Sequence, residues 1–333
     1  MNKAGTRQGR AYLVACMLVW CGACAGLAGR EDSGKKGQSP KANMSVEDRQ
    51  MTECVGRFQL AMPEVLSVAG RSHSIYGVEV NTVALPAGGV ETLWRERLAR
   101  ISALSPPSGI TNTVIRKFDL QYGVSAVWYF ANSGDDELRS LEAVKPEADH
   151  AVLVLFEGIA GKEDVVETLL KNVLGAYVPK VRQGFCVGHG SITSEPSINE
   201  YARIAFAHRR LPSFETTVET QTVKEPDNRT YSSLDEEQQV VRAHGGELIT
   251  LRNQTRLVAS LEGKEIWVSV VTPREPSFVR FTWHFAGVSG DSSRPMINIK
   301  GIAPTNQQAE LETIWETVLK SFRSVPPAGA LTP

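Results

Sequence analysis

Serine nucleophiles and metal-binding histidines have characteristic neighbours in a sequence, and those neighbours are missing from this one. There is no G-x-S-x-G motif: Gly287-Val288-Ser289-Gly290 lacks the fifth position and leads from an expected strand into a loop, not a helix. His189-Gly190-Ser191 is superficially similar to an oxyanion-hole segment, but without a nucleophile we interpret it as a turn. The histidines show neither H-x-x-x-H nor H-E-x-x-H spacing, and glycine motifs for phosphates are also missing. We therefore expect no catalytic residue, no metal and no cofactor. The histidines are His73, His150, His189, His208, His244 and His284.

Two acidic clusters could supply paired carboxylates, as glycosidases do. Asp135-Asp136-Glu137 follows an apolar strand and lies in an expected loop, where acids are normally solvated. Asp235-Glu236-Glu237 begins an expected helix, where acids interact favourably with the helix dipole. Neither setting favours catalysis. Asp135, Asp136 and Glu137 remain candidates for contact with a basic partner.

Two of the five cysteines lie beyond the N-terminal segment, at Cys54 and Cys186. In an oxidising compartment two lone cysteines often pair, and this pair would close a loop of more than a hundred residues. The alternative is a pair of buried free thiols. A zinc site is not expected, because neither cysteine has a second cysteine or a histidine at ligand spacing, and Cys186 with His189 is too isolated a pair.

The first 25 residues have the pattern of an export signal. Basic residues precede a short apolar run, Ala11–Trp20, which small residues follow. The run is too short for a comfortable membrane span of roughly 20 residues, although an uncleaved amphipathic anchor is the alternative. Gly22-Ala23-Cys24 is similar to the end of a lipoprotein signal, which makes Cys24 the candidate for lipidation; Ala23-Cys24-Ala25 would serve equally as an ordinary cleavage site. We expect a mature protein in the periplasm, either lipid-anchored to the membrane or soluble.

Residues 26–50 are expected to form a flexible tether, because Arg30–Asn43 is rich in Gly, Ser, Lys and Pro and cannot bury a core. About 285 residues remain, enough for one large domain or two ordinary ones. The net charge is −1 and no basic stripe is present, which argues against a nucleic-acid partner.

The chain contains an internal repeat. Cys54-Val55-Gly56-Arg57-Phe58 and Cys186-Val187-Gly188-His189-Gly190 open two stretches of similar length. Each stretch closes with an amphipathic helix, over residues 163–174 and 311–322, whose apolar residues follow the helical period. We therefore predict two tandem similar domains, 51–183 and 184–327.

Each domain is predicted to be α+β, with a mostly antiparallel sheet and helices packed on one face. In the first domain we expect strands at 75–83, 126–130 and 151–156, the last a continuous apolar run typical of a strand buried on both faces. A helix face runs from Val90 to Ile101. In the second domain a short helix through Val241 ends at Gly245-Gly246. Strands are expected to follow at 248–252, 266–271, 279–286 and 296–300.

The order of several segments resembles the Tle cognate immunity protein 4 family. In the first half the resemblance is carried by Cys54-Val55-Gly56-Arg57-Phe58 with Met62-Pro63. The second half is more similar to the family. Its matching segments are Gly184-Phe185-Cys186, Arg242–Leu248, Phe281–Phe285, Arg294–Ile299 and the helix around Ile314-Trp315. Gly188-His189-Gly190 and the polar linker between Gln221 and Ser232 depart from the family pattern.

The resemblance implies a function. Members of this family resemble a two-domain clamp that binds a toxic phospholipase, an α/β-hydrolase effector delivered into the periplasm by type VI secretion. The bound effector can no longer reach membrane lipid, and such a binder needs no catalytic residues. The alternative is a non-enzymatic envelope lipoprotein that acts as a binding or structural module, which predicts an apolar pocket inside one domain.

Overall fold

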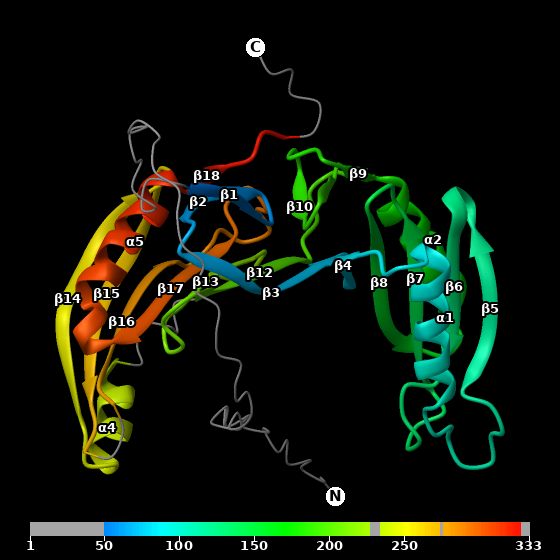
Figure 1. Cartoon of the computed structure of the whole chain (residues 1–333), viewed down its shortest axis with the longest axis horizontal. Coiled ribbons are helices and arrows are strands. Elements are labelled where there is room, and N and C mark those ends of the chain that lie inside the picture. The colour runs from blue at the N-terminus through cyan, green and yellow to red at the C-terminus, as the bar shows by residue number, and fades with distance from the viewer. Residues whose placement is uncertain (1–49, 227–233, 274–275, 328–333) are drawn as a thin grey trace, which may run out of the picture. The chain divides into compact units, whose positions relative to one another are not determined.

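The computed structural model describes residues 50–226, 234–273 and 276–327, and these residues all fall in one compact unit. The first half contains β1 (Gln50–Val55), β2 (Phe58–Pro63), β3 (Leu66–Ile75), β4 (Val78–Ala84), α1 (Gly89–Ser102), β5 (Val114–Leu120), the single turn η2 (Gln121–Gly123), β6 (Val124–Tyr129), β7 (Leu138–Pro146), β8 (His150–Ile159), α2 (Glu163–Gly175) and β9 (Tyr177–Pro179). Figure 1 shows these elements in blue to green.

The second half follows the same plan. It contains β10 (Phe185–Val187), β11 (Gly190–Ile192), β12 (Glu200–His208), β13 (Glu215–Gln221), α4 (Leu234–Ala243), β14 (Glu247–Val258), β15 (Leu261–Val271), β16 (Phe278–Phe285), β17 (Met296–Pro304), the single turn η3 (Thr305–Gln307), α5 (Gln308–Ser321) and β18 (Arg323–Ser324).

One antiparallel sheet of 12 strands runs through both halves, in the order β14-β15-β16-β17-β13-β12-β3-β4-β8-β7-β6-β5. The central pair is β3 with β12, one strand from each half. On either side of this pair the strands follow in equivalent order, so β4-β8-β7-β6-β5 corresponds to β13-β17-β16-β15-β14. The predicted α+β class with a mostly antiparallel sheet is confirmed. The division into domains 51–183 and 184–327 stays a prediction, because the sheet is continuous across it.

The hairpins that open the two halves are exchanged between them. The hairpin β1–β2 pairs through β2 with β18, the last strand of the second half, and packs on α5 (Figure 1). The hairpin β10–β11 pairs through β11 with β9, the last strand of the first half. Each half is therefore completed by a hairpin from the other.

The helices cover both faces of the sheet, whereas we expected them on one face. On β6, Ala126 and Trp128 pack in the same cluster as α2, while Val127 and Tyr129 pack with α1. On β15, Trp267 joins the cluster that contains α5, and Ile266 and Val268 pack with α4. Strands that carry apolar side chains on both faces need cover on both, because exposed apolar surface is unfavourable in water.

The predicted helices and most of the predicted strands are found close to their expected positions. The apolar run at 151–156 lies in β8, with Val152 and Val154 in the cluster of α2 and Ala151 and Leu153 in that of α1. The strand expected at 75–83 is instead split by the turn Tyr76-Gly77 into β3 and β4. β14 continues to Val258, six residues beyond the predicted end at Arg252.

Candidate functional site

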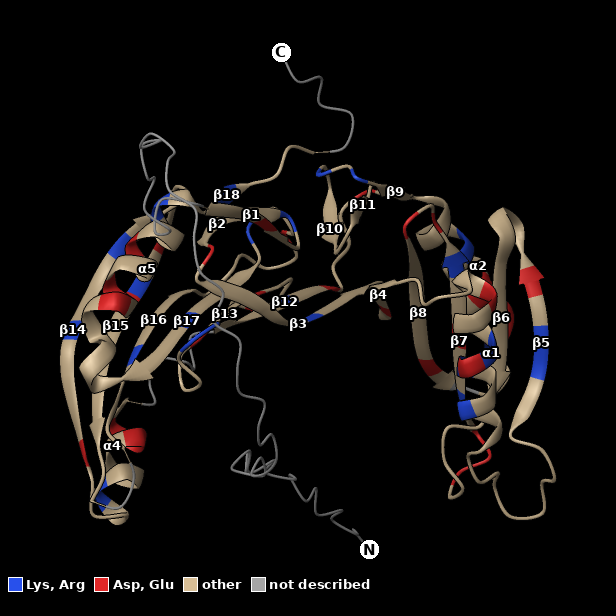
Figure 2. Ribbon diagram, viewed as in Figure 1, with Lys and Arg blue, Asp and Glu red and all other residues tan. Residues whose placement is uncertain are grey.

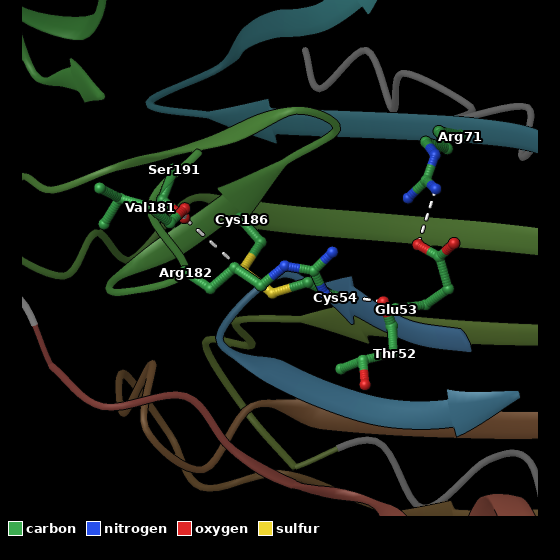
Figure 3. The surroundings of a disulfide bond; sticks show 8 residues. All are labelled: Thr52, Glu53, Cys54, Arg71, Val181, Arg182, Cys186 and Ser191. Atoms are coloured by element: carbon green, nitrogen blue, oxygen red, sulfur yellow. Dashed lines mark hydrogen bonds and ion pairs between the residues drawn. A yellow bond between two sulfur atoms is a disulfide. The ribbon is translucent and has the colours of Figure 1, made fainter. Parts of the chain in front are cut away.

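The two hairpins are joined by a disulfide between Cys54 on β1 and Cys186 on β10 (Figure 3). Their Cα atoms are 5.9 Å apart although the residues are 132 positions apart in the chain. Both cysteines are buried, and the amide of Cys186 donates to the carbonyl of Gly56 at 2.8 Å. The pairing predicted for these cysteines is confirmed, and the disulfide excludes Cys186 as a metal ligand.

A buried ion pair lies next to this junction. The guanidinium of Arg57, in the turn between β1 and β2, donates twice to the carboxylate of Glu200 at the start of β12, at 2.8 and 2.7 Å. Glu200 also accepts a bond from the amide of Ser197 at 2.8 Å. The amide of Val325 donates to the carbonyl of Arg57 at 2.8 Å, so the end of the second half is fixed here as well. A bidentate pair of this kind sets orientation as well as proximity.

A polar pocket of about 450 Å³ opens beside the disulfide. Its walls come from β1, β3 and β4 of the first half, from the loop after β9, and from the β10–β11 turn. Arg71 donates to Glu53 at 2.7 Å, and Arg182 donates to the backbone carbonyl of Thr52 at 2.8 Å (Figure 3). His189 and Gly190 line the same pocket.

We interpreted His189-Gly190-Ser191 as a turn, but only His189 lies in the turn after β10, whereas Gly190 and Ser191 belong to strand β11. The hydroxyl of Ser191 is buried and donates to the carbonyl of Val181 at 2.7 Å, so it is not presented as a nucleophile. Next to the turn, the two nitrogens of His150 contact Asp149 at 2.6 Å and the hydroxyl of Tyr177 at 2.8 Å. Burial raises the pKa of Tyr177, and the hydrogen bond from His150 lowers the pKa of Asp149. This chain of hydrogen bonds ends in a buried phenol and reaches no nucleophile.

The acidic cluster predicted to contact a partner lies in the loop between β6 and β7, apart from the disulfide. The carboxylate of Asp135 accepts the amides of Glu137 and Leu138, at 2.8 and 3.2 Å, and so shapes the loop. The side chains of Asp136 and Glu137 are exposed. Their availability is consistent with partner contact, which stays a prediction.

Several predictions concern residues that the structure does not describe. The export signal at 1–25, with the candidate lipidation residue Cys24, and almost all of the tether at 26–50 lie outside the described residues. Within the described ranges no helix is long and apolar enough to cross a bilayer. The same ranges hold no group of three or more His, Cys, Asp or Glu side chains placed to bind a metal ion.

Little in the sequence indicates that four residues would meet at this junction, namely Arg57, Arg71, Arg182 and Glu200. Arg57 stood out only as part of the repeated Cys-Val-Gly segment. Its partner Glu200 is 143 positions away, and no local pattern links two residues at that separation.

The family of the second half is shown by its match to a known domain. Residues 178–327 match the family model of the Tle cognate immunity protein 4 C-terminal domain. This part of the chain belongs to that family. The matched region begins in β9 and ends after β18, so it contains all of the second half. The resemblance predicted from the order of segments is confirmed. None of the curated proteins matches the chain.

Solved structures of immunity proteins share the fold over most of the chain. The apo structure of the type VI secretion immunity protein TplEi from Pseudomonas aeruginosa has 17% sequence identity and a TM-score of 0.67, covering 85% of this chain and 99% of that one. The crystal structure of the Tle4–Tli4 complex has 15% identity and a TM-score of 0.68, covering 84% and 99%. TplEi complexed with "L" peptide has 15% identity and a TM-score of 0.65, with the same coverage of 84% and 99%. The fold of the family therefore extends into the first half.

Proposed function

We propose that this protein is a periplasmic immunity protein that binds and neutralises a phospholipase effector of a type VI secretion system. The observation that carries the proposal is the family match over residues 178–327, together with a fold shared over most of the chain with solved immunity proteins. One of those structures is a complex of Tli4 with Tle4, so a protein of this fold has been found bound to its effector.

The proposed action is binding without catalysis. The hydroxyl of Ser191 donates to the backbone carbonyl of Val181. Nearby, His150 contacts Asp149 and Tyr177, and this chain of hydrogen bonds reaches no nucleophile. Tight inhibition by binding needs a complementary interface of roughly 800 Å² per partner with a few buried anchor residues. The bound effector would then be kept from membrane lipid.

The export signal predicted at 1–25 is part of this proposal, because the antidote has to be in the compartment where the effector acts. Lipidation at Cys24 would hold it at the membrane through the tether, and cleavage after Ala25 would release it. A mass spectrum of the mature protein distinguishes the two forms.

Growth protection tests the proposal. The cognate lipase, expected from the neighbouring open reading frame, is expressed with a periplasmic signal in cells that carry either the full chain or a chain lacking Met1–Gly26. The full chain should restore growth and the shortened chain should not. Full protection by the shortened, untargeted chain would refute the periplasmic action.

A further inference from the structure

The pocket beside the disulfide is lined mainly by polar and basic groups. Arg71, Lys180, Arg182 and His189 contribute to its walls, and Glu53 is its acidic residue. Arg71 and Glu53 neutralise each other in an ion pair at 2.7 Å. The charge that remains in the pocket therefore comes from the loop between β9 and β10, which carries basic positions in Figure 2.

The two cations of this loop are incompletely paired. Lys180 is 75% exposed, and its ammonium forms a long ion pair with Asp149, at 3.6 Å. Within the described residues, the guanidinium of Arg182 donates one hydrogen bond, to the neutral carbonyl of Thr52. Both charges are thus available to a ligand at the mouth of the pocket.

The backbone holds these residues in a fixed arrangement. Lys180 has φ 62°, a left-handed backbone conformation that residues other than glycine rarely adopt. Its amide donates to the carbonyl of His189 at 2.8 Å. Opposite it, a Cβ atom on Gly188 would stand 1.9 Å from the hydroxyl of Thr82. The disulfide fixes the two hairpins that frame the pocket. A strained lysine on a rigid frame is preorganised for binding.

We propose that this pocket is a carboxylate-binding site, in which Lys180 and Arg182 receive an acidic side chain of a protein partner. Guanidinium and ammonium groups bind carboxylates through charge-assisted hydrogen bonds, and Arg182 can offer two parallel N–H groups. The identity of the partner rests on the proposed function, since the effector is the protein that would supply the acid.

A protein carboxylate fits the pocket better than a lipid headgroup does. Its volume, about 450 Å³, suits one or two side chains. Binding to an anionic bilayer by charge normally requires a cluster of four to eight basic residues, whereas this site offers two incompletely paired cations.

The test uses the purified, oxidised protein and a tetraglutamate peptide with blocked ends as the probe. NMR titration follows the ring resonances of His189, with inorganic phosphate and phosphatidylglycerol vesicles as parallel probes. The variant is Lys180→Gly with Arg182→Gln: glycine suits the positive φ and glutamine keeps an amide donor, so the fold should be retained. The matched control is Lys117→Ala with Lys162→Ala, two exposed lysines on the same half.

We expect a saturable shift with the peptide, a loss of affinity of at least tenfold in the pocket variant, and an unchanged affinity in the control. The absence of a saturable shift, or an equal loss in both variants, would overturn the site. Binding of the vesicles through these residues without binding of the peptide would also overturn it, in favour of a lipid site.

Affinity for the cognate effector separates this inference from the proposed function. If the wild-type protein binds the effector, the pocket variant should bind at least tenfold more weakly, and equal binding would refute the inference alone. If the wild-type protein does not bind the effector, the proposed function fails and the peptide titration still decides whether the carboxylate site exists.

Discussion

His73 is a buried histidine at the centre of the sheet, on β3. Burial, and to a smaller extent the neighbouring Arg71, lowers its pKa to about 4 from the ordinary 6.5, so the folded protein holds it neutral near pH 7. The unfolded chain takes up a proton at this ring below about pH 6.5. The stability that the neutral ring of His73 contributes is therefore fully present above pH 6.5 and is lost as the pH falls towards 4. The loss is about 3 kcal/mol, at roughly 1.4 kcal/mol for each pKa unit.

Leucine has a volume similar to that of histidine and carries no ionisable group, so the variant His73→Leu should lack this part of the pH dependence. Urea unfolding of both proteins at pH 7.5, 5.5 and 4.5 measures it. The free energy of unfolding of the wild type minus that of the variant should fall on acidification, because only the wild type carries His73 and carboxylate effects are common to both. Parallel pH profiles would contradict the account of His73.

The turn between β14 and β15 carries avoidable strain. Val258 pairs with Leu261, so Ala259 and Ser260 form a two-residue turn, and their φ angles are 51° and 64°. Turns of this geometry favour Asn-Gly, because both positions need positive φ. Ser260→Gly should raise the free energy of unfolding by about 0.5–1 kcal/mol. Ser72→Gly, within strand β3, is the control and should lower it; a loss of stability in Ser260→Gly would contradict the assignment of strain.

At the scale of elements, the disulfide joins two hairpins that have exchanged places. It closes a loop of 132 residues, which in the chain-entropy model is worth up to about 5 kcal/mol. Cys54→Ala with Cys186→Ala should lower the free energy of unfolding by about 2–5 kcal/mol, measured by urea unfolding. Dithiothreitol should destabilise the wild type and leave this double variant unchanged. An equal response of both proteins to reduction would contradict a stabilising role.

The long helices and the buried strand β8 could be predicted, because their periodicity or unbroken apolar run is a local signal. The end of β14 could not: Arg252, Asn253 and Gln254 are polar, and an edge strand shows no alternation when much of it faces solvent. The run at 151–156 did contain the information that helices cover both faces, since its neighbours alternate between two clusters. We predicted helices on one face of the sheet because we did not draw this consequence from the apolar run.

For the whole molecule, the exchange of hairpins could not be predicted. The repeated Cys-Val-Gly segments show that two equivalent hairpins exist, and only the fold shows that each completes the other half. The pocket with Lys180 and Arg182 depends on that exchange, because residues of β1 and of the β10–β11 turn line it together. Sequence therefore predicted the disulfide and the family, but not the arrangement around the disulfide.

The continuous sheet and the covalent junction suit the proposed binding function, because they connect the two halves into one body. One hydrophobic core cluster contains residues of both halves, so neither half buries its apolar side chains on its own. In such a body a partner could be bound without a large change of shape.

The decisive experiment for the proposed function is direct inhibition of the cognate lipase. The purified protein is mixed with the purified lipase from the neighbouring open reading frame, and phospholipase activity is measured on vesicles as the ratio of the two proteins is raised. Lipase activity should fall to background near equal molar amounts, and the two proteins should elute together in gel filtration. Full lipase activity in an excess of this protein, with separate elution, would contradict it.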